Sequence, residues 1–171
     1  MKFMYDDGGR KAAGFKGEAG DCVCRAICIA ARLDYKEVYD RLADGTAKQR
    51  ATKRTGKRKR SARNGINCKR KWFKDYMGEL GFVWTPTMLV GSGCKVHLAE
   101  GELPEGRLVV QVSKHLTAVV DQVVRDTHDP RRDTHYVTNE RRDLRPGEKL
   151  LADGKIAGVS KRCVYGYWTL N

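Results

Sequence analysis

Cys22 is the side chain of this sequence that is best placed to act as a nucleophile. It follows Asp21, a residue type that often caps helices, and opens the segment CVCRAICIAARL, which contains neither Gly nor Pro. In the first turn of a helix, unpaired backbone N–H groups and the helix dipole favour the thiolate, the reactive form of cysteine. Cys24 would point about 200° away around the helix, and Cys28 would lie deeper in the core. The helix position therefore singles out Cys22.

A thiol nucleophile needs a base, and His115 is the candidate. It begins the β-branched run HLTAVVD, and the next run, QVVRD, ends in Asp126. A hairpin with its turn near 121–122 would bring His115 and Asp126 level on neighbouring antiparallel strands. A histidine held by a carboxylate can take the thiol proton and return it to a leaving group. We expect Cys22, His115 and Asp126 to meet in one cleft.

Each of these residues also has an ordinary structural interpretation. Cysteines without an export signal are usually buried, strand histidines are often simply hydrogen-bonded, and an aspartate after a strand commonly forms a turn. The combination of all three residue types in this order favours chemistry. The other histidines are expected on surface or loop positions, and they are His97, His128 and His135.

Three helices are expected in the first half of the chain to position the thiol. The first covers 22–33. The second begins at Asp34, which forms a capping box with Glu37, and ends at Gly45. The third follows Asn67 as its cap and carries CKRKWFKDYMGELG, whose aromatic and apolar side chains share one face.

The second half of the chain is rich in Val and Thr and predicts strands. The expected strands are FVWTPTML, RLVVQVS, HLTAVVD, QVVRD and CVYGYWTL. Residues 127–161 are expected to be loops with at most one hairpin, and 1–20 a glycine-rich loop. Helices followed by a meander predict an α+β fold, with N-terminal helices packed on a C-terminal antiparallel β-sheet, as a single domain over 1–171.

A strongly basic segment lies at 46–63 and contributes much of the net charge of +13. Nine of its eighteen residues are Lys or Arg, and none is acidic. Such a run cannot bury itself, so a flexible loop is expected. Its charge would attract nucleic acid through phosphate contacts, without base stacking, because it contains no aromatic residue. The candidate nucleic-acid-binding residues are Lys48, Arg50, Lys53, Arg54, Lys57, Arg58, Lys59 and Arg60.

The six cysteines are expected to be free thiols. The N-terminus has no apolar export segment, and no apolar run approaches the roughly 18–20 residues that span a bilayer. We therefore expect a cytoplasmic protein with no membrane partner, in a compartment where disulfides are rare. The cysteine spacing does not match paired zinc ligands, and neither a metal nor another cofactor is expected.

Two short blocks of the sequence resemble papain-like cysteine peptidases. GDCVCRAICIA is similar to their nucleophile helix, and HLTAVVDQVVRDTHD resembles their His–strand–turn–strand–Asn/Asp segment. DTHD stands where papain relatives carry Asn-Ser-Trp-Gly, so the resemblance implies that Asp126 orients His115. Asp129 is the alternative, because Asp129-Pro130 resembles the Asp-Pro of bacteriocin-processing peptidases.

The resemblance implies a papain-like fold and a Cys–His–Asp hydrolase acting on a peptide, protein or other amide substrate, in a small bacterial or phage protein. Papain-like enzymes usually place a Gln six residues before the Cys as an oxyanion donor, and this chain has Lys16 there. Lys16 and the Cys22 backbone N–H are therefore the candidate oxyanion donors. The alternative function is a catalytically inactive papain-like basic protein that binds nucleic acid.

Overall fold

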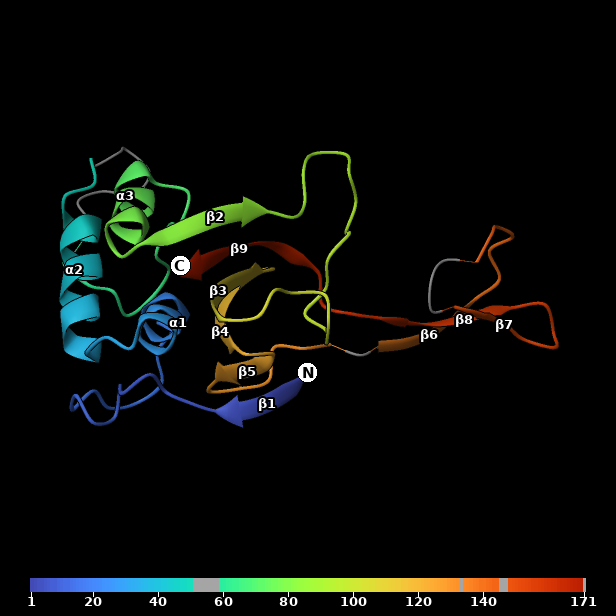
Figure 1. The fold of residues 1–171 in the computed structure, drawn as a ribbon, viewed down its shortest axis with the longest axis horizontal. Helices are drawn as coiled ribbons and strands as arrows, with labels where there is room; N and C mark the ends of the chain where they lie inside the picture. Colours follow the sequence, from blue (N-terminus) through green and yellow to red (C-terminus); the bar gives the residue numbers. More distant parts are fainter. Residues whose placement is uncertain (51–58, 133, 145–147, 171) are drawn as a thin grey trace.

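A computed structural model describes residues 1–50, 59–132, 134–144 and 148–170 of the chain. Within them the fold is α+β, and its helices lie together on one side of the main sheet (Figure 1). Helix α1 packs directly on the sheet, and α2 packs on α1. The predicted helices are confirmed, with the bounds α1 Cys22–Ala31, α2 Tyr35–Ala47 and α3 Lys71–Glu79.

Two helix boundaries differ from the expectation. Helix α2 continues through Gly45, which was expected to end it. A Cβ atom at Gly45 would lie 2.4 Å from ring atoms of Trp72, so glycine here allows the indole of α3 to approach the helix. Asn67 does not cap α3, because its side chain accepts the N–H of Lys69 in the turn before the helix. The predicted cap at Asp34 is confirmed by its bond from the Glu37 N–H, at 3.0 Å.

The main sheet has six strands in the order β1-β5-β4-β3-β9-β2. All neighbours pair antiparallel except β1, which runs parallel to β5. The sheet is therefore mixed, so the expectation of an antiparallel sheet is wrong. The expected loop over 1–20 is wrong only at its start, where β1 forms. Strand β1 is mostly exposed and pairs through its backbone, so it carries no alternating apolar pattern. The strands are β1 Lys2–Tyr5, β2 Phe82–Pro86, β3 Arg107–Val112, β4 His115–Val120, β5 Val123–Asp126 and β9 Val164–Leu170.

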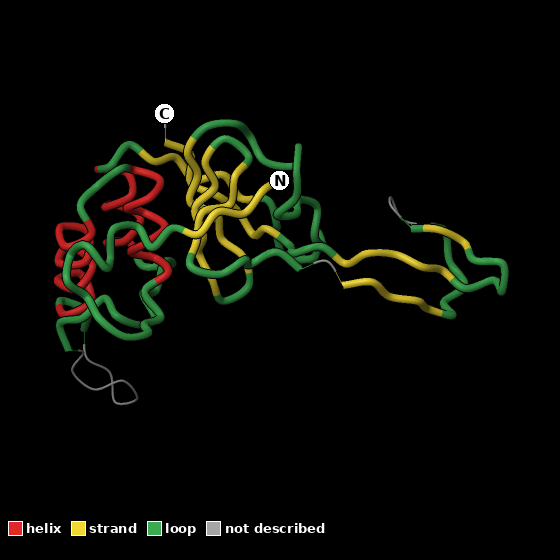
Figure 2. Tube along the Cα trace, turned by 90° about the horizontal axis from the view of Figure 1, so that it is seen from below, coloured by secondary structure: helices red, strands yellow, loops and turns green. Residues whose placement is uncertain are grey.

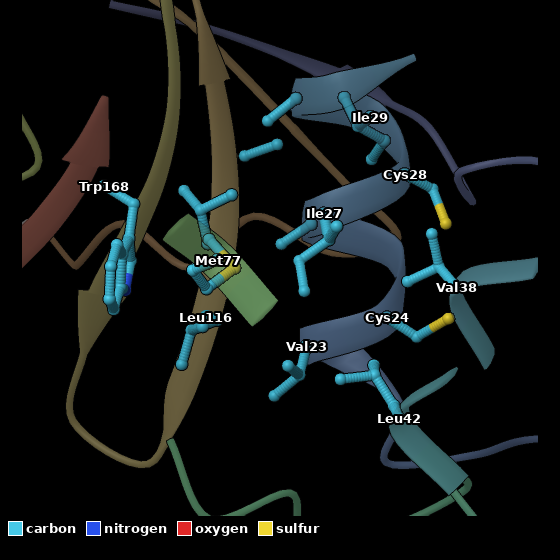
Figure 3. Close-up of a cluster of buried hydrophobic side chains, with 14 of the residues drawn as sticks. Val23, Cys24, Ile27, Cys28, Ile29, Val38, Leu42, Met77, Leu116 and Trp168 are labelled. Carbon is cyan, nitrogen blue, oxygen red and sulfur yellow. The ribbon is translucent and has the colours of Figure 1, made fainter. Parts of the chain in front are cut away.

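Helix α1 is buried on two sides, which explains why its sequence is so apolar. Val23 and Ile27 point toward the sheet, where Leu116 lies, and Cys24 and Cys28 point toward α2 (Figure 3). The prediction that Cys28 is a core residue is confirmed, and Cys24, which was expected only to point away from Cys22, is buried as well. The thiol that begins the helix is thus held on a rigid element.

Part of the segment between β2 and β3, at 96–103, packs against the opposite face of the sheet. Leu98 and Leu103 of this segment pack against Leu108, Val110 and Val119. At β3 and β4 both faces of the sheet are therefore buried, which accounts for the nearly continuous apolar character of these two strands.

Residues 134–160 include a separate three-stranded sheet that projects away from the main body (Figure 2). Its order is β6-β8-β7, so the expectation of at most one hairpin over 127–161 is wrong. Val137, Leu150 and Val159 are exposed on these strands, so burial imposes no alternating pattern that would reveal them. The strands are β6 Thr134–Thr138, β7 Lys149–Leu150 and β8 Ile156–Ser160.

Cys94 and Cys163 form a disulfide, which contradicts the expectation of six free thiols. Backbone bonds hold the two segments together, from Leu98 N–H to the Arg162 carbonyl and from Val164 N–H to the Val96 carbonyl, both 2.8 Å. This long-range contact has no local sequence signal. Disulfides persist in oxidising compartments, so the pair gives no support to a reducing cytoplasm. The four other cysteines are free.

Replacing Cys163 with serine should lower the free energy of unfolding by up to about 4 kcal/mol, because the disulfide closes a loop of 69 residues in the unfolded chain. Denaturant unfolding measures this. A reductant should bring wild type down to the level of the variant and leave the variant unchanged. If the reductant leaves the denaturant midpoint of the wild-type protein unchanged, the disulfide between Cys94 and Cys163 is contradicted.

Candidate active site

The beginning of α1 and the beginning of β4 border the same open cleft, whose volume is about 1040 Å³. Helix α1 lies beside β4, so two segments far apart in the sequence meet here (Figure 1). Cys22 and His115 both line the cleft, together with Lys16 from the loop before α1.

The β4–β5 hairpin brings Asp126 to His115. Asp121 and Gln122 form its turn with left-handed φ values of 47° and 61°. Ala118 pairs with Arg125, so Asp126 lies diagonally across from His115 on the same face of the sheet. The expectation that the two residues lie level is therefore wrong by two residues. His115 Nε2 lies 2.7 Å from Asp126 Oδ2.

Asp126 is buried, with 3% of its surface exposed, and is held from both sides. Its Oδ1 accepts the Thr127 N–H at 2.7 Å, while Oδ2 contacts His115. Burial would raise the pKa of Asp126, but its bond to His115 and the charge of that ring lower it, with help from Thr117 and Thr127. The carboxylate is therefore ionised beside the imidazole.

Cys22 and His115 favour a thiolate–imidazolium pair. Burial would raise the pKa of Cys22, but hydrogen bonds to the His115 ring and the Leu116 backbone, with the His115 charge, lower it below the ordinary 9.0. Burial likewise opposes protonation of His115, yet hydrogen bonds to Asp126 and Cys22 and their charges raise its pKa to about 9. Because Nε2 faces Asp126, Nδ1 is the ring nitrogen left for Cys22.

Asp21 does not use its side chain to cap α1, which contradicts the sequence expectation. Its buried carboxylate instead accepts hydrogen bonds from Arg10 Nε at 2.8 Å, from Arg25 Nη1 and from the Tyr35 hydroxyl. These donors offset the negative charge of Asp21. The carboxylate next to Cys22 therefore opposes formation of the thiolate less than an unpaired carboxylate would. The first-turn N–H groups of α1 receive no side-chain cap.

Arg25 is a positioning residue that the sequence analysis missed. Its guanidinium is 8% exposed and joins Asp21 to Asp126, since Nη2 lies 3.8 Å from Asp126 Oδ1. The signal was available as an acid and a base four residues apart on one helix. The apolar residues that surround Arg25 in this helix hide that signal.

Replacing Asp126 with asparagine should lower the pKa of His115 from about 9 toward its ordinary 6.5, because the neutral amide no longer stabilises the imidazolium. An NMR titration of the His115 ring measures the shift. Asp129→Asn is the matched control, since Asp129 bonds Arg131 and is not paired with His115. An equal shift in both variants would contradict the pairing.

Both candidate oxyanion donors border the cleft. Lys16 is exposed there, and its carbonyl accepts Arg10 Nη2 at 3.1 Å, so the arginine that binds Asp21 also holds the Lys16 segment. The Cys22 N–H lies in the first helical turn, where no intrahelical acceptor is available. The two groups could donate to a developing oxyanion at the Cys22 side of the cleft.

His128 also lines the cleft and was not among the predicted site residues. Its ring centre lies 4.8 Å from that of His115. Donor atoms of His115, Asp126 and His128 lie within 4.8 Å of one another, which makes them the described residues closest to a metal-ligand set. A metal there would have to replace the 2.7 Å bond between His115 and Asp126. The arrangement fits an acid–base pair more directly.

Cys68 is a second free thiol in the cleft. Burial and the nearby charge of Cys22 raise the pKa of Cys68 to about 12, so it is a poor nucleophile at neutral pH. The remaining histidines lie elsewhere, with His97 bound to Glu102 at 2.9 Å and His135 in β6 rather than in a loop.

The basic segment is only partly described. Lys53, Arg54, Lys57 and Arg58 lie outside the described residues, while Lys48, Arg50 and Lys59 are exposed. Arg60 bonds Asp44 at 2.5 Å and Asp40 at 3.1 Å, so α2 supplies the acids that the segment itself lacks. Ala62 is buried. The expected flexible loop over 46–63 is therefore wrong near its C-terminal end. There Arg60 is bonded to α2, and Ala62 is buried.

No family model, curated protein or solved structure matches the chain. Among the described residues, no helix has the length and apolar character that crossing a membrane would require.

Proposed function

We propose that this protein is a papain-like cysteine hydrolase that cleaves a peptide or related amide bond. The observation that carries the proposal is the 2.7 Å contact between His115 and Asp126, beside a thiol whose pKa is lowered by His115. A helix-borne thiol facing a strand-borne histidine is the arrangement expected of that class. Substrate would enter from the open cleft, whose volume of about 1040 Å³ suits a short extended segment of chain.

The reaction follows from the protonation states. The Cys22 thiolate attacks the carbonyl carbon, and the resulting oxyanion accepts hydrogen bonds from the Cys22 N–H and Lys16. The His115 imidazolium then gives its proton to the leaving nitrogen, the C–N bond breaks, and an acyl-thioester remains on Cys22. Water attacks this ester, with His115 taking a proton from the water and Asp126 holding the ring, and the thiolate departs.

The test is a comparison of wild type with Cys22→Ala on a complex peptide library, with new termini identified by mass spectrometry. The proposal expects cleavages by wild type that the variant does not make. Cleavage by both proteins would show a contaminant. Absence of any cleavage or acyl-thioester at Cys22, with nucleic-acid binding unaffected by Cys22→Ala, would instead favour a basic binding protein without turnover.

A further inference from the structure

A second hollow, of about 300 Å³, adjoins the cleft at His115. Lys114, His115 and His128 line both spaces, whereas Cys22 lines only the larger one. The smaller hollow therefore lies on the histidine side of the site, away from the thiol.

The lining of this hollow is positively charged. Its carboxylate, on Asp129, is already paired with Arg131 at 2.6 Å. Arg162 donates from Nη2 to the Ser113 carbonyl at 2.7 Å, but its Nε is buried with no hydrogen-bond partner among the described residues. Burial and the charge of Arg132 lower the pKa of Arg162, which indicates that two guanidinium groups repel each other here. A carboxylate in the hollow that both arginines line would offset their like charge and accept charge-assisted hydrogen bonds from them.

The reaction fixes which part of a substrate would reach this hollow. His115 protonates the leaving nitrogen, so the leaving-group portion lies on the side of His115. Resting on the proposed function, we infer that Arg132 and Arg162, with Lys114, bind a carboxylate on the leaving-group side of the scissile amide. The substrate class is therefore a peptide with an acidic side chain or a free C-terminal carboxylate just after the cleaved bond.

The experiment measures how peptides protect Cys22 from alkylation by iodoacetamide. Three probes separate the carboxylate sources: N-acetyl-triglutamine amide has none, N-acetyl-triglutamine has only the C-terminal one, and N-acetyl-triglutamate amide has only side chains. At least one carboxylate probe should slow labelling several-fold at concentrations where the neutral amide does nothing. Arg132→Gln/Arg162→Gln should weaken that protection about tenfold or more.

The matched control is Lys11→Gln/Lys69→Gln, which removes the same charge from cleft residues that do not line the hollow. Protection that falls equally in both double variants would overturn the inference in favour of general polyanion attraction, and so would equal protection by oligothymidylate.

Arg132 is exposed, so the single variant Arg132→Gln tests the inference if the double variant misfolds. If iodoacetamide shows no preference for Cys22 without peptide, the proposed function fails. If the preference exists but no carboxylate protects, only this inference fails.

Discussion

Replacing His115 with alanine should slow the alkylation of Cys22 near pH 7 by about tenfold or more, because each unit of thiol pKa changes the thiolate fraction tenfold below that pKa. Burial raises the pKa of Cys22, and the hydrogen bond and charge of His115 lower it together with a hydrogen bond to the Leu116 backbone. Without the ring, only the Leu116 bond opposes burial, and the pKa of Cys22 should rise. The rate of iodoacetamide labelling, resolved by residue with mass spectrometry, measures this.

His97→Ala is the matched control for this change. His97 also contacts a carboxylate, Glu102, at 2.9 Å, but it does not line the cleft. This variant should label Cys22 at the wild-type rate. If His115→Ala also labels at the wild-type rate, the ring does not activate the thiol and the triad is wrong.

Replacing Asp21 with alanine should lower the free energy of unfolding by about 3–5 kcal/mol, because it leaves buried positive charges without their partner. Asp21 is 1% exposed and bonds Arg10, Arg25 and the Tyr35 hydroxyl. Denaturant unfolding measures the loss.

Asp40 offers the comparison, because it also bonds two cations, Lys36 and Arg60, but at the protein surface. Asp40→Ala should leave stability nearly unchanged, since exposed ion pairs contribute little. If Asp21→Ala and Asp40→Ala lower the free energy of unfolding equally, burial does not make the ion pairs of Asp21 more important for stability than those of Asp40.

The sequence was sufficient to predict the parts of the site that depend on local structure. Helix α1 begins at Cys22, where an unbroken apolar segment starts. The β4–β5 hairpin brings Asp126 to the same face as His115, because two short strands meet at a tight turn. Both signals lie within about a dozen residues, where periodicity and turn chemistry act.

The contacts that support these residues could not be predicted in the same way. Arg10 and Tyr35 reach Asp21 from a loop and from a second helix, and no local pattern encodes that convergence. The Cys94–Cys163 disulfide and parallel strand β1 likewise join segments distant in the sequence. Lys16 was found by a positional resemblance, whereas His128 needed the folded arrangement of rings around His115.

The most direct test of the thiolate–imidazolium pair is the rate of Cys22 alkylation by iodoacetamide as a function of pH. Cys22 should be labelled ahead of Cys68, with a half-maximal rate below pH 9.0 and a second change near pH 9 as His115 loses its proton. A single transition at or above the ordinary thiol pKa, or equal labelling of Cys22 and Cys68, would contradict it.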